Sequence, residues 1–261
     1  MQKIKSIPRH SKTTAIYTHV SNKALMKILN PLDQILEGER KWAVHSWASF
    51  CLAGRIIMNG NIDFHIPDCN EFRNGYGAYT QERRGAVYFE ALSIISENWG
   101  NPIPMAQGIQ KLIRSWHRFY ANFDFDSLVN IINNNLQVLY EFRTRNIFSL
   151  TDADDDKIES LFNQFLDALK RSRDNSKSPV SVAKALSPLA TNFFPLWDSN
   201  IAFSYDCFYL ADISAPPYIR FCKKMKMMSE HVNHCAPNPD DRALLKRIDE
   251  YNYSKYTMHW I

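Results

Sequence analysis

The stretch "DDDKIESLFNQFLDALKRSR", residues 154–173, shows most clearly which kind of fold the chain adopts. Its apolar residues recur every three or four positions, a spacing that places side chains on one face of an α-helix. Acidic residues stand at its start and basic residues at its end, where they complement the partial charges of a helix. The stretch therefore predicts an amphipathic helix with one buried face. The residues of that face are Ile158, Leu161, Phe162, Phe165, Leu166 and Leu169.

The same spacing recurs along the rest of the chain, and the sustained alternation typical of β-strands is absent. Only 8 of the 261 residues are glycine, which argues against a turn-rich β-sandwich. We therefore predict an all-α protein with about eight to ten helices. Besides residues 154–173, helices are expected at residues 41–58, 85–99, 108–120, 125–142, 216–232 and 240–253.

Two stretches interrupt the helical pattern and suggest how the chain is divided. Residues 59–85 are predicted to form a long loop that contains glycine, and residues 171–181 to form a linker. The linker would separate an N-terminal helical lobe, residues 1–170, from a C-terminal helical lobe, residues 171–261, although the two could pack as one compact domain. A cleft between two such lobes is a usual place for a ligand.

The net charge of +4 is unevenly distributed. Residues 1–55 contain nine Lys and Arg against three Asp and Glu, a local charge of +6, and "YIRFCKKMK" at 218–226 adds four cations without an acid. In contrast, "TDADDDKIES" at 151–160 contains five acids and one lysine. Clustered cations attract a polyanion such as DNA. A solvated, lysine-rich surface explains the pattern equally well.

The sequence gives no sign of export or membrane insertion. Basic residues at the start are not followed by an apolar segment, so no signal peptide is predicted. The most apolar passage is interrupted by His45 and Arg55, which indicates a buried helix rather than a membrane span. The five cysteines, at positions 51, 69, 207, 222 and 235, fit reduced thiols better than a disulfide framework. We expect a soluble, cytoplasmic monomer without a membrane partner.

The residues with the clearest chemical potential lie in "VAKALSPLATNFFPLWDSNIAFSY", residues 182–205. This apolar and mostly helical passage contains one lysine, Lys184, and, fourteen residues later, Asp198. Asp198 can cap the helix that follows it or act as a working acid. Lys184 is either an exposed helix lysine or an amine whose pKa is lowered by apolar surroundings. The sequence leaves both pairs of alternatives open.

This passage resembles the helix-hairpin-helix superfamily of DNA glycosylases. Its helix carries a lysine and is followed by a turn and by a proline–hydrophobic–aspartate element that opens another helix. In that family the lysine lies on the second helix of the hairpin and the aspartate at the mouth of the base pocket. Here "SVAKAL" supplies Lys184 and "FPLWDSNIAFSY" supplies Asp198. The resemblance covers about residues 170–210 and extends to divergent members that excise modified cytosine from phage DNA. The glycine-rich hairpin turn of the family has no counterpart here.

The resemblance implies two helical lobes with a cleft that receives a modified or damaged base flipped out of DNA. It implies hydrolysis of the N-glycosidic bond without a cofactor. The Asp198 carboxylate would stabilise an oxocarbenium-like sugar, and Lys184 would attack C1′ to form a Schiff base or would contact the substrate. Two alternatives remain. One is an N-glycosidase that acts on a free nucleoside or nucleotide, and the other is a non-enzymatic, nucleic-acid-binding helical module in which Asp198 is only a cap.

Further candidates for contacts to DNA or substrate lie beside Asp198 and in "RNGYGAYTQERR", residues 73–84. In this second stretch glycines would allow close backbone approach, tyrosines would stack on bases and arginines would contact phosphate. A surface loop without such a role is the alternative. The candidates are Arg73, Tyr76, Tyr79, Arg83, Arg84, Trp197, Ser199 and Asn200.

Histidine and cysteine in "HVNHC", residues 231–235, could bind zinc together with Cys207 and Cys222. The spacing of these residues matches no common zinc framework. We therefore predict no metal site.

Overall fold

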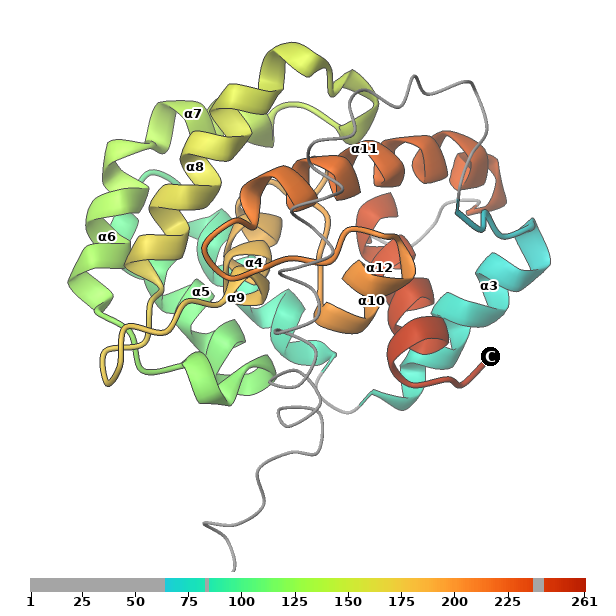
Figure 1. Ribbon diagram of the computed structural model, residues 1–261, viewed down its shortest axis with the longest axis horizontal. Helices are drawn as coiled ribbons and strands as arrows, with labels where there is room; N and C mark the ends of the chain where they lie inside the picture. The colour runs from blue at the N-terminus through green and yellow to red at the C-terminus, as the bar shows by residue number, and fades with distance from the viewer. Residues whose placement is uncertain (1–63, 83–84, 237–241) are drawn as a thin grey trace, which may run out of the picture. The chain divides into compact units, whose positions relative to one another are not determined.

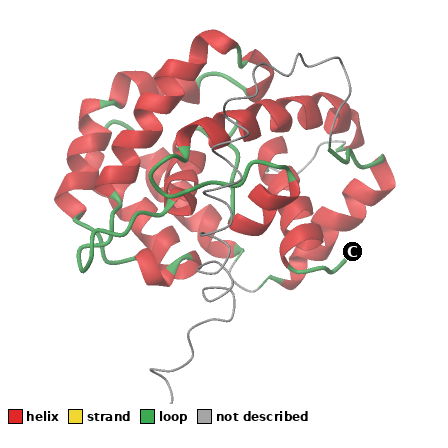
Figure 2. Ribbon diagram, viewed as in Figure 1, coloured by secondary structure: helices red, strands yellow, loops and turns green. Residues whose placement is uncertain are grey.

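The structure is a computed structural model that describes residues 64–82, 85–236 and 242–261. These residues belong to one compact unit, Asp63–Ile261. They are mostly helical and contain no β-strand, which confirms the all-α prediction for this part of the chain (Figure 2). Among these residues, no helix has the length and the apolar composition needed to cross a membrane. The helix predicted at 41–58 and the basic residues 1–55 lie outside the described residues.

The predicted helices between residues 85 and 253 are present, with one change. The single helix expected at 125–142 is divided in two at Asn135, whose side-chain Nδ2 donates to Ile131 O and to Gln164 Oε1, both at 2.9 Å. The described α-helices are α3 (Cys69–Ala78), α4 (Ala86–Glu97), α5 (Pro102–Trp116), α6 (Phe125–Asn134), α7 (Leu136–Arg143), α8 (Asp155–Ala168), α9 (Pro179–Leu189), α10 (Ser199–Ser204), α11 (Ala215–Val232) and α12 (Leu244–Asn252) (Figure 1).

Helix α8 carries the apolar face from which the fold was predicted, and this face is buried. Ile158, Phe162 and Phe165 are fully buried, and α8 packs against α6, α9 and α11. Helices α6, α7 and α8 lie side by side on one side of α9 (Figure 1). Helix α9 in turn packs against α4, α5 and α8, so that it runs through the core of the described unit.

The loop predicted at 59–85 is wrong over residues 69–81, which form α3 and the short helix η1 (Tyr79–Gln81). The Asp68 side chain caps α3 by accepting hydrogen bonds from the backbone N–H groups of Asn70 and Glu71, at 2.8 and 2.9 Å. Helix α3 packs against α12, and a Cβ atom at Gly75 would collide with the Tyr251 ring. Gly75 is therefore required by helix packing, not by the approach of a ligand.

A matched pair of substitutions in α3 tests this packing. Gly75→Ala should lower the free energy of unfolding by about 1–3 kcal/mol, since the added methyl group overpacks the contact with Tyr251. Gly77→Ala should raise it by about 0.5–1 kcal/mol, because a Cβ there meets nothing within 4 Å and alanine favours the helix. Urea unfolding of both variants measures the difference. Equal stabilities would contradict the close packing of α3 on α12.

The expectation of reduced cysteines is wrong for one pair. Cys69, at the start of α3, forms a disulfide with Cys235, which lies in the short helix η5 (Asn233–Cys235) after α11. The two are 166 positions apart, so their spacing in the sequence could not reveal the contact. Cys207 and Cys222 are buried free thiols.

The predicted linker lies in the connection between α8 and α9, residues 169–178, and residues 179–181 already belong to α9. Asp174 pairs with Arg171 and accepts hydrogen bonds from Ser176 N and Oγ, at 3.1 and 2.8 Å. Asn175 takes the left-handed conformation with φ 55°, which asparagine adopts more readily than most residues. An asparagine thus supplies the backbone geometry for which glycine is usual. The division into lobes at residue 170 remains a prediction.

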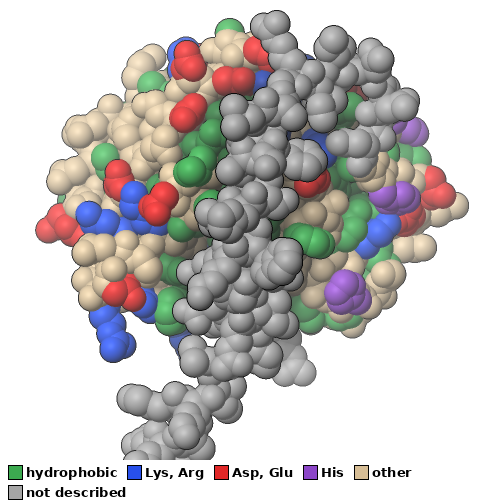
Figure 3. Space-filling view, in the orientation of Figure 1, with side chains coloured by type: hydrophobic (Ala, Val, Ile, Leu, Met, Phe, Trp, Pro, Cys, Tyr) green, Lys and Arg blue, Asp and Glu red, His purple; other side chains and the backbone are tan. Residues whose placement is uncertain are grey.

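The basic stretch 218–226 and the acidic stretch 151–160 are not separate patches. Lys223 Nζ lies 2.7 Å from carboxylate oxygens of both Asp152 and Asp155. Lys224 and Lys226 donate to backbone carbonyls. On the face shown in Figure 3, acidic and basic side chains are interspersed. These lysines therefore secure the fold, and they contribute less to a cationic surface than the sequence suggests.

Candidate active site

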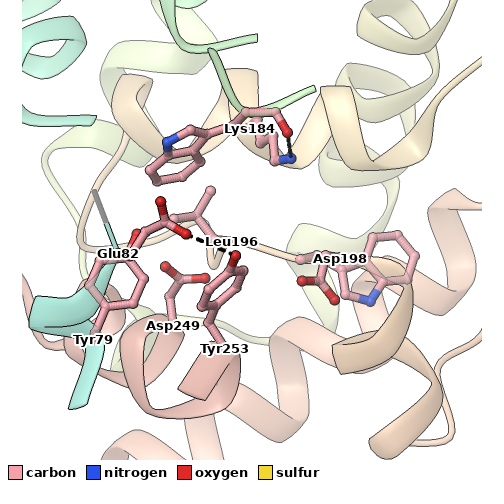
Figure 4. A pocket seen from close by; sticks show the side chains of 9 residues that line it. Tyr79, Glu82, Lys184, Leu196, Asp198, Asp249 and Tyr253 are labelled. Atoms are coloured by element: carbon pink, nitrogen blue, oxygen red, sulfur yellow. Dashed lines mark hydrogen bonds between the residues drawn. The ribbon is translucent and has the colours of Figure 1, made fainter. Parts of the chain in front are cut away.

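A pocket of about 150 Å³ opens where α9, the residues before α10, α12 and the end of η1 meet (Figure 4). Both predicted catalytic residues, Lys184 and Asp198, line it. The stretches that line the pocket are distant in sequence. The complete lining consists of Tyr79, Glu82, Trp116, Lys184, Leu196, Trp197, Asp198, Asp249 and Tyr253.

Lys184 is placed by a helix that is otherwise buried. In α9, which the structure describes in full, ten of the eleven residues are buried and Lys184 is the exception. The helix begins at Ser178, whose side chain accepts a hydrogen bond from Ser181 N at 3.2 Å, and proline follows at the first helical position. Lys184 Nζ donates to Trp116 O at 3.3 Å. Because α9 packs against α4, α5 and α8, the side of the helix that carries Lys184 is the one that faces the pocket.

Asp198 is the N-cap of α10, which is one of the two roles that the sequence left open. Its Oδ1 accepts a hydrogen bond from Ile201 N at 2.8 Å, and its Oδ2 accepts one from Thr257 Oγ1 at 2.9 Å. Burial raises the pKa of this carboxyl, while the two hydrogen bonds and the charge of Lys184 oppose the increase. Both oxygens are thus fixed before any ligand binds, and the carboxylate is held at the wall of the pocket.

Two further carboxylates line the pocket, and sequence reasoning missed both. Glu82 Oε2 accepts a hydrogen bond from Tyr253 OH at 3.1 Å, and Asp249 Oδ2 accepts one from Lys246 Nζ at 2.7 Å. Figure 4 shows Glu82 and Asp249 close together on one side of the pocket and Asp198 on the other. Glu82 stands beside arginines and Asp249 in a charged helix, so neither is conspicuous in the sequence. The available signal was the composition of α12, which has too many charges for its buried position.

The remaining walls are largely aromatic. Tyr79 is only 7% exposed, and Trp116 and Tyr253 line the pocket with it. The buried ammonium of Lys246 lies 4.3 Å from the centre of the Tyr79 ring and 5.5 Å from that of Trp116. An engineered protein cavity of similar volume binds benzene, so the space suits one six-membered ring. The pocket therefore combines a place for a flat ring with carboxylates at its edge.

The other predicted contact residues are dispersed. Tyr79 and Trp197 line the pocket, although Trp197 is 1% exposed and packs mainly in the core. Ser199 and Asn200 are exposed on the first turn of α10 and are not among the lining residues.

Three arginines and one tyrosine complete the predicted set. Arg73 Nε donates to Cys235 O at 2.9 Å, and Tyr76 packs against Phe72 with ring centres 5.2 Å apart. Neither residue lines the pocket. Arg83 and Arg84 lie outside the described residues.

His117 follows the pocket residue Trp116 and is the C-cap of α5. Its Nδ1 lies 3.0 Å from Ser181 Oγ and 3.3 Å from Ser178 Oγ. Burial, assisted by the charge of Lys184, lowers the pKa of His117 to about 3. The imidazole is therefore neutral at pH 7 and places no second positive charge beside Lys184.

This lowered pKa predicts a pH dependence of stability. An unfolded histidine takes up a proton below pH of about 6.5, whereas folded His117 stays neutral until about pH 3. Its contribution to stability is therefore complete above pH 6.5 and is lost as the pH falls from there toward 3. Between pH 7 and pH 5, wild type should lose about 2 kcal/mol more unfolding free energy than His117→Gln. Urea unfolding at the two pH values measures this, and an equal loss in both proteins would mean that folded His117 accepts the proton.

A group of potential metal ligands lies outside the lining of the pocket. It consists of Cys69, His234 and Cys235. It does not include Cys207 or Cys222, which the sequence had suggested as zinc ligands.

Comparisons of the chain with protein-family models, with curated proteins and with solved structures give no match. The geometry of the pocket is therefore the basis on which its function is argued.

Proposed function

We propose that the protein is a DNA glycosylase that hydrolyses the N-glycosidic bond of a modified or damaged base flipped into this pocket. The supporting observation is that Lys184, the one residue of α9 that is not buried, and Asp198 line the same partly aromatic pocket. An isolated helix cap would not require a lysine, two further carboxylates and four aromatic residues around it. The proposal includes the two-lobed, helix-hairpin-helix-like arrangement that the sequence suggested.

The chemistry follows from the charge that develops during cleavage. Breaking an N-glycosidic bond passes through a sugar with positive charge at C1′ and O4′. A carboxylate already held by hydrogen bonds to both oxygens, as Asp198 is, stabilises this charge with little rearrangement. The aromatic walls, which include Tyr79 and Trp116, would hold the base, and Asp198 would also orient the attacking water. Glu82 and Asp249 are placed to accept hydrogen bonds from the exocyclic groups of the base.

A second candidate, an N-glycosidase for a free nucleoside, is favoured by the charges. Lys223 pairs with acidic side chains of the same chain, and the pocket carries three carboxylates. A DNA-binding surface would therefore depend mainly on the basic residues 1–55. The two candidates share the chemistry at Asp198 and differ in how the rest of the substrate is bound.

One assay distinguishes the candidates. The full chain is incubated with duplexes containing damaged or phage-type modified bases and, separately, with the matching free nucleosides. Abasic sites revealed by alkaline cleavage, together with binding that weakens steeply as salt rises, are expected for the glycosylase. Cleavage of nucleosides alone would establish the second candidate. Binding to DNA without base release from either substrate would leave a non-enzymatic binding module.

The role of Lys184 is tested by trapping with borohydride. If its amine attacks C1′, reduction of the resulting imine should yield a covalent protein–DNA adduct that Lys184→Ala does not form. Lys255→Ala is the control, since this lysine pairs with Glu71 and does not line the pocket. An active wild-type enzyme that yields no adduct would assign the attack to water and leave Lys184 as a contact to substrate.

A further inference from the structure

Three side chains from opposite ends of the described unit converge at the start of α3. Cys69 Sγ, His234 Nε2 and Cys235 Sγ all lie within 4.8 Å of one another. The histidine nitrogen is 3.4 Å from one sulfur and 3.6 Å from the other. The two sulfurs are joined as a disulfide. His234 directly precedes Cys235 in the sequence, whereas its contact with Cys69 spans 165 positions.

The distances match those between ligands of a zinc ion. With zinc–sulfur bonds of about 2.3 Å and zinc–nitrogen bonds of about 2.0 Å at tetrahedral angles, sulfur and nitrogen ligands lie about 3.5 Å apart. Both observed separations agree with this value. Two thiolates and one imidazole are also ligand types that zinc prefers.

The surrounding structure holds the ligands in place. Cys69 is the first residue of α3, whose start is fixed by the Asp68 cap. On the other side, Arg73 Nε donates to Cys235 O at 2.9 Å and Arg247 to Ala236 O at 3.4 Å. The segment that carries His234 and Cys235 is thereby tied to both α3 and α12.

We propose that Cys69, His234 and Cys235 bind one Zn²⁺ when the two cysteines are reduced. Reduction of the disulfide gives two thiols and takes two electrons from a thiol, which also supplies the two protons and leaves as a disulfide. With a phosphine, the two protons come from water, whose oxygen leaves in the phosphine oxide. Zinc then displaces the two thiol protons, and the sulfurs separate to about 3.8 Å around the ion. A water molecule completes the four ligands. The metal and the disulfide exclude each other because they use the same two sulfur atoms.

Metal titration of the reduced full-length protein tests the site. The protein is reduced with a phosphine, freed of metal with a chelator and titrated with Zn²⁺ or Co²⁺. We expect one ion per chain and, with cobalt, a thiolate-to-metal charge-transfer band. Cys69→Ser and Cys235→Ser should remove the band, and His234→Ala should weaken binding by about a hundredfold. Cys222→Ala and His259→Asn, which change a cysteine and a histidine outside the cluster, should bind like wild type.

Oxidising the His234 variant distinguishes a folding defect from the loss of a metal ligand. His234→Ala should still form the Cys69–Cys235 disulfide as wild type does, which shows that the two sulfurs still meet. The proposal is overturned if reduced wild type binds no more metal than Cys69→Ser. It is also overturned if His234→Ala binds zinc as tightly as wild type, because the imidazole would then not be a ligand. Neither result bears on base release, which is measured separately.

Discussion

Asp198→Asn should reduce base release about a hundredfold or more while leaving the fold intact. Asparagine can keep both hydrogen bonds of the aspartate, accepting from Ile201 N and donating to Thr257 Oγ1. It is also a good N-cap, so the free energy of unfolding should stay within about 1 kcal/mol of wild type. What the variant lacks is the negative charge beside the developing oxocarbenium ion.

Single-turnover rates of base release and urea unfolding should be measured together. Ser199→Ala, on the same helix but outside the pocket, is the control and should release base at the wild-type rate. The pH profile gives a second readout, because the proposed mechanism requires the ionised carboxylate of Asp198. Since burial raises the pKa of Asp198, wild-type activity should fall as the pH falls through this raised pKa. If the Asp198→Asn protein is folded and fully active, Asp198 serves only as a helix cap.

Lys246→Met should lower the free energy of unfolding by about 3–5 kcal/mol, the usual effect of leaving buried charges without a partner. Lys246 is 2% exposed and lies 2.7 Å from Asp249 and 3.6 Å from Glu250. Burial acts to lower the pKa of Lys246, but the two carboxylates outweigh it and raise the pKa, so the ammonium stays charged. Methionine fills a similar volume and leaves Asp249 without its ion pair in the wall of the pocket.

Lys223→Met is the matched control, because Lys223 also bridges two carboxylates but does so near the surface. It should cost at most about 1 kcal/mol in urea unfolding. The double variant Lys246→Met, Asp249→Asn should recover part of the stability, because the buried negative charge is removed as well. Similar losses in Lys246→Met and Lys223→Met would show that the α12 charges are accessible to water.

Two residues of the site could be predicted because their polarity differs from that of the residues around them. Lys184 and Asp198 are polar residues in an apolar passage, and such residues are usually retained for a reason that concerns their surroundings. Glu82 and Asp249 occur among other charged residues, and only the tertiary structure shows that they face a pocket. Local pattern cannot report which side of a highly charged helix is buried.

A helix can be predicted when its own sequence has a strong apolar repeat, and α3 was missed because it has none. The apolar face of α8 repeats over four turns, whereas α3 contains Gly75 and Gly77 and has a weak apolar pattern. Its stability comes from its contact with α12 and not from the residues around it. The Cys69–Cys235 pair follows from the same long-range contact and was hidden for the same reason.

The packing of α3 on α12 also sets the order of events during synthesis of the chain. Tyr251 OH donates to Glu71 at 2.8 Å across 180 positions of sequence. At about 5–20 residues per second, the ribosome needs roughly 10 s or more to deliver α12 after α3 has emerged. During this interval Tyr79 and Glu82 are without the helix that completes their pocket. The pocket is therefore completed late, and during most of its synthesis a nascent chain exposes to chaperones the face of α3 that α12 later covers.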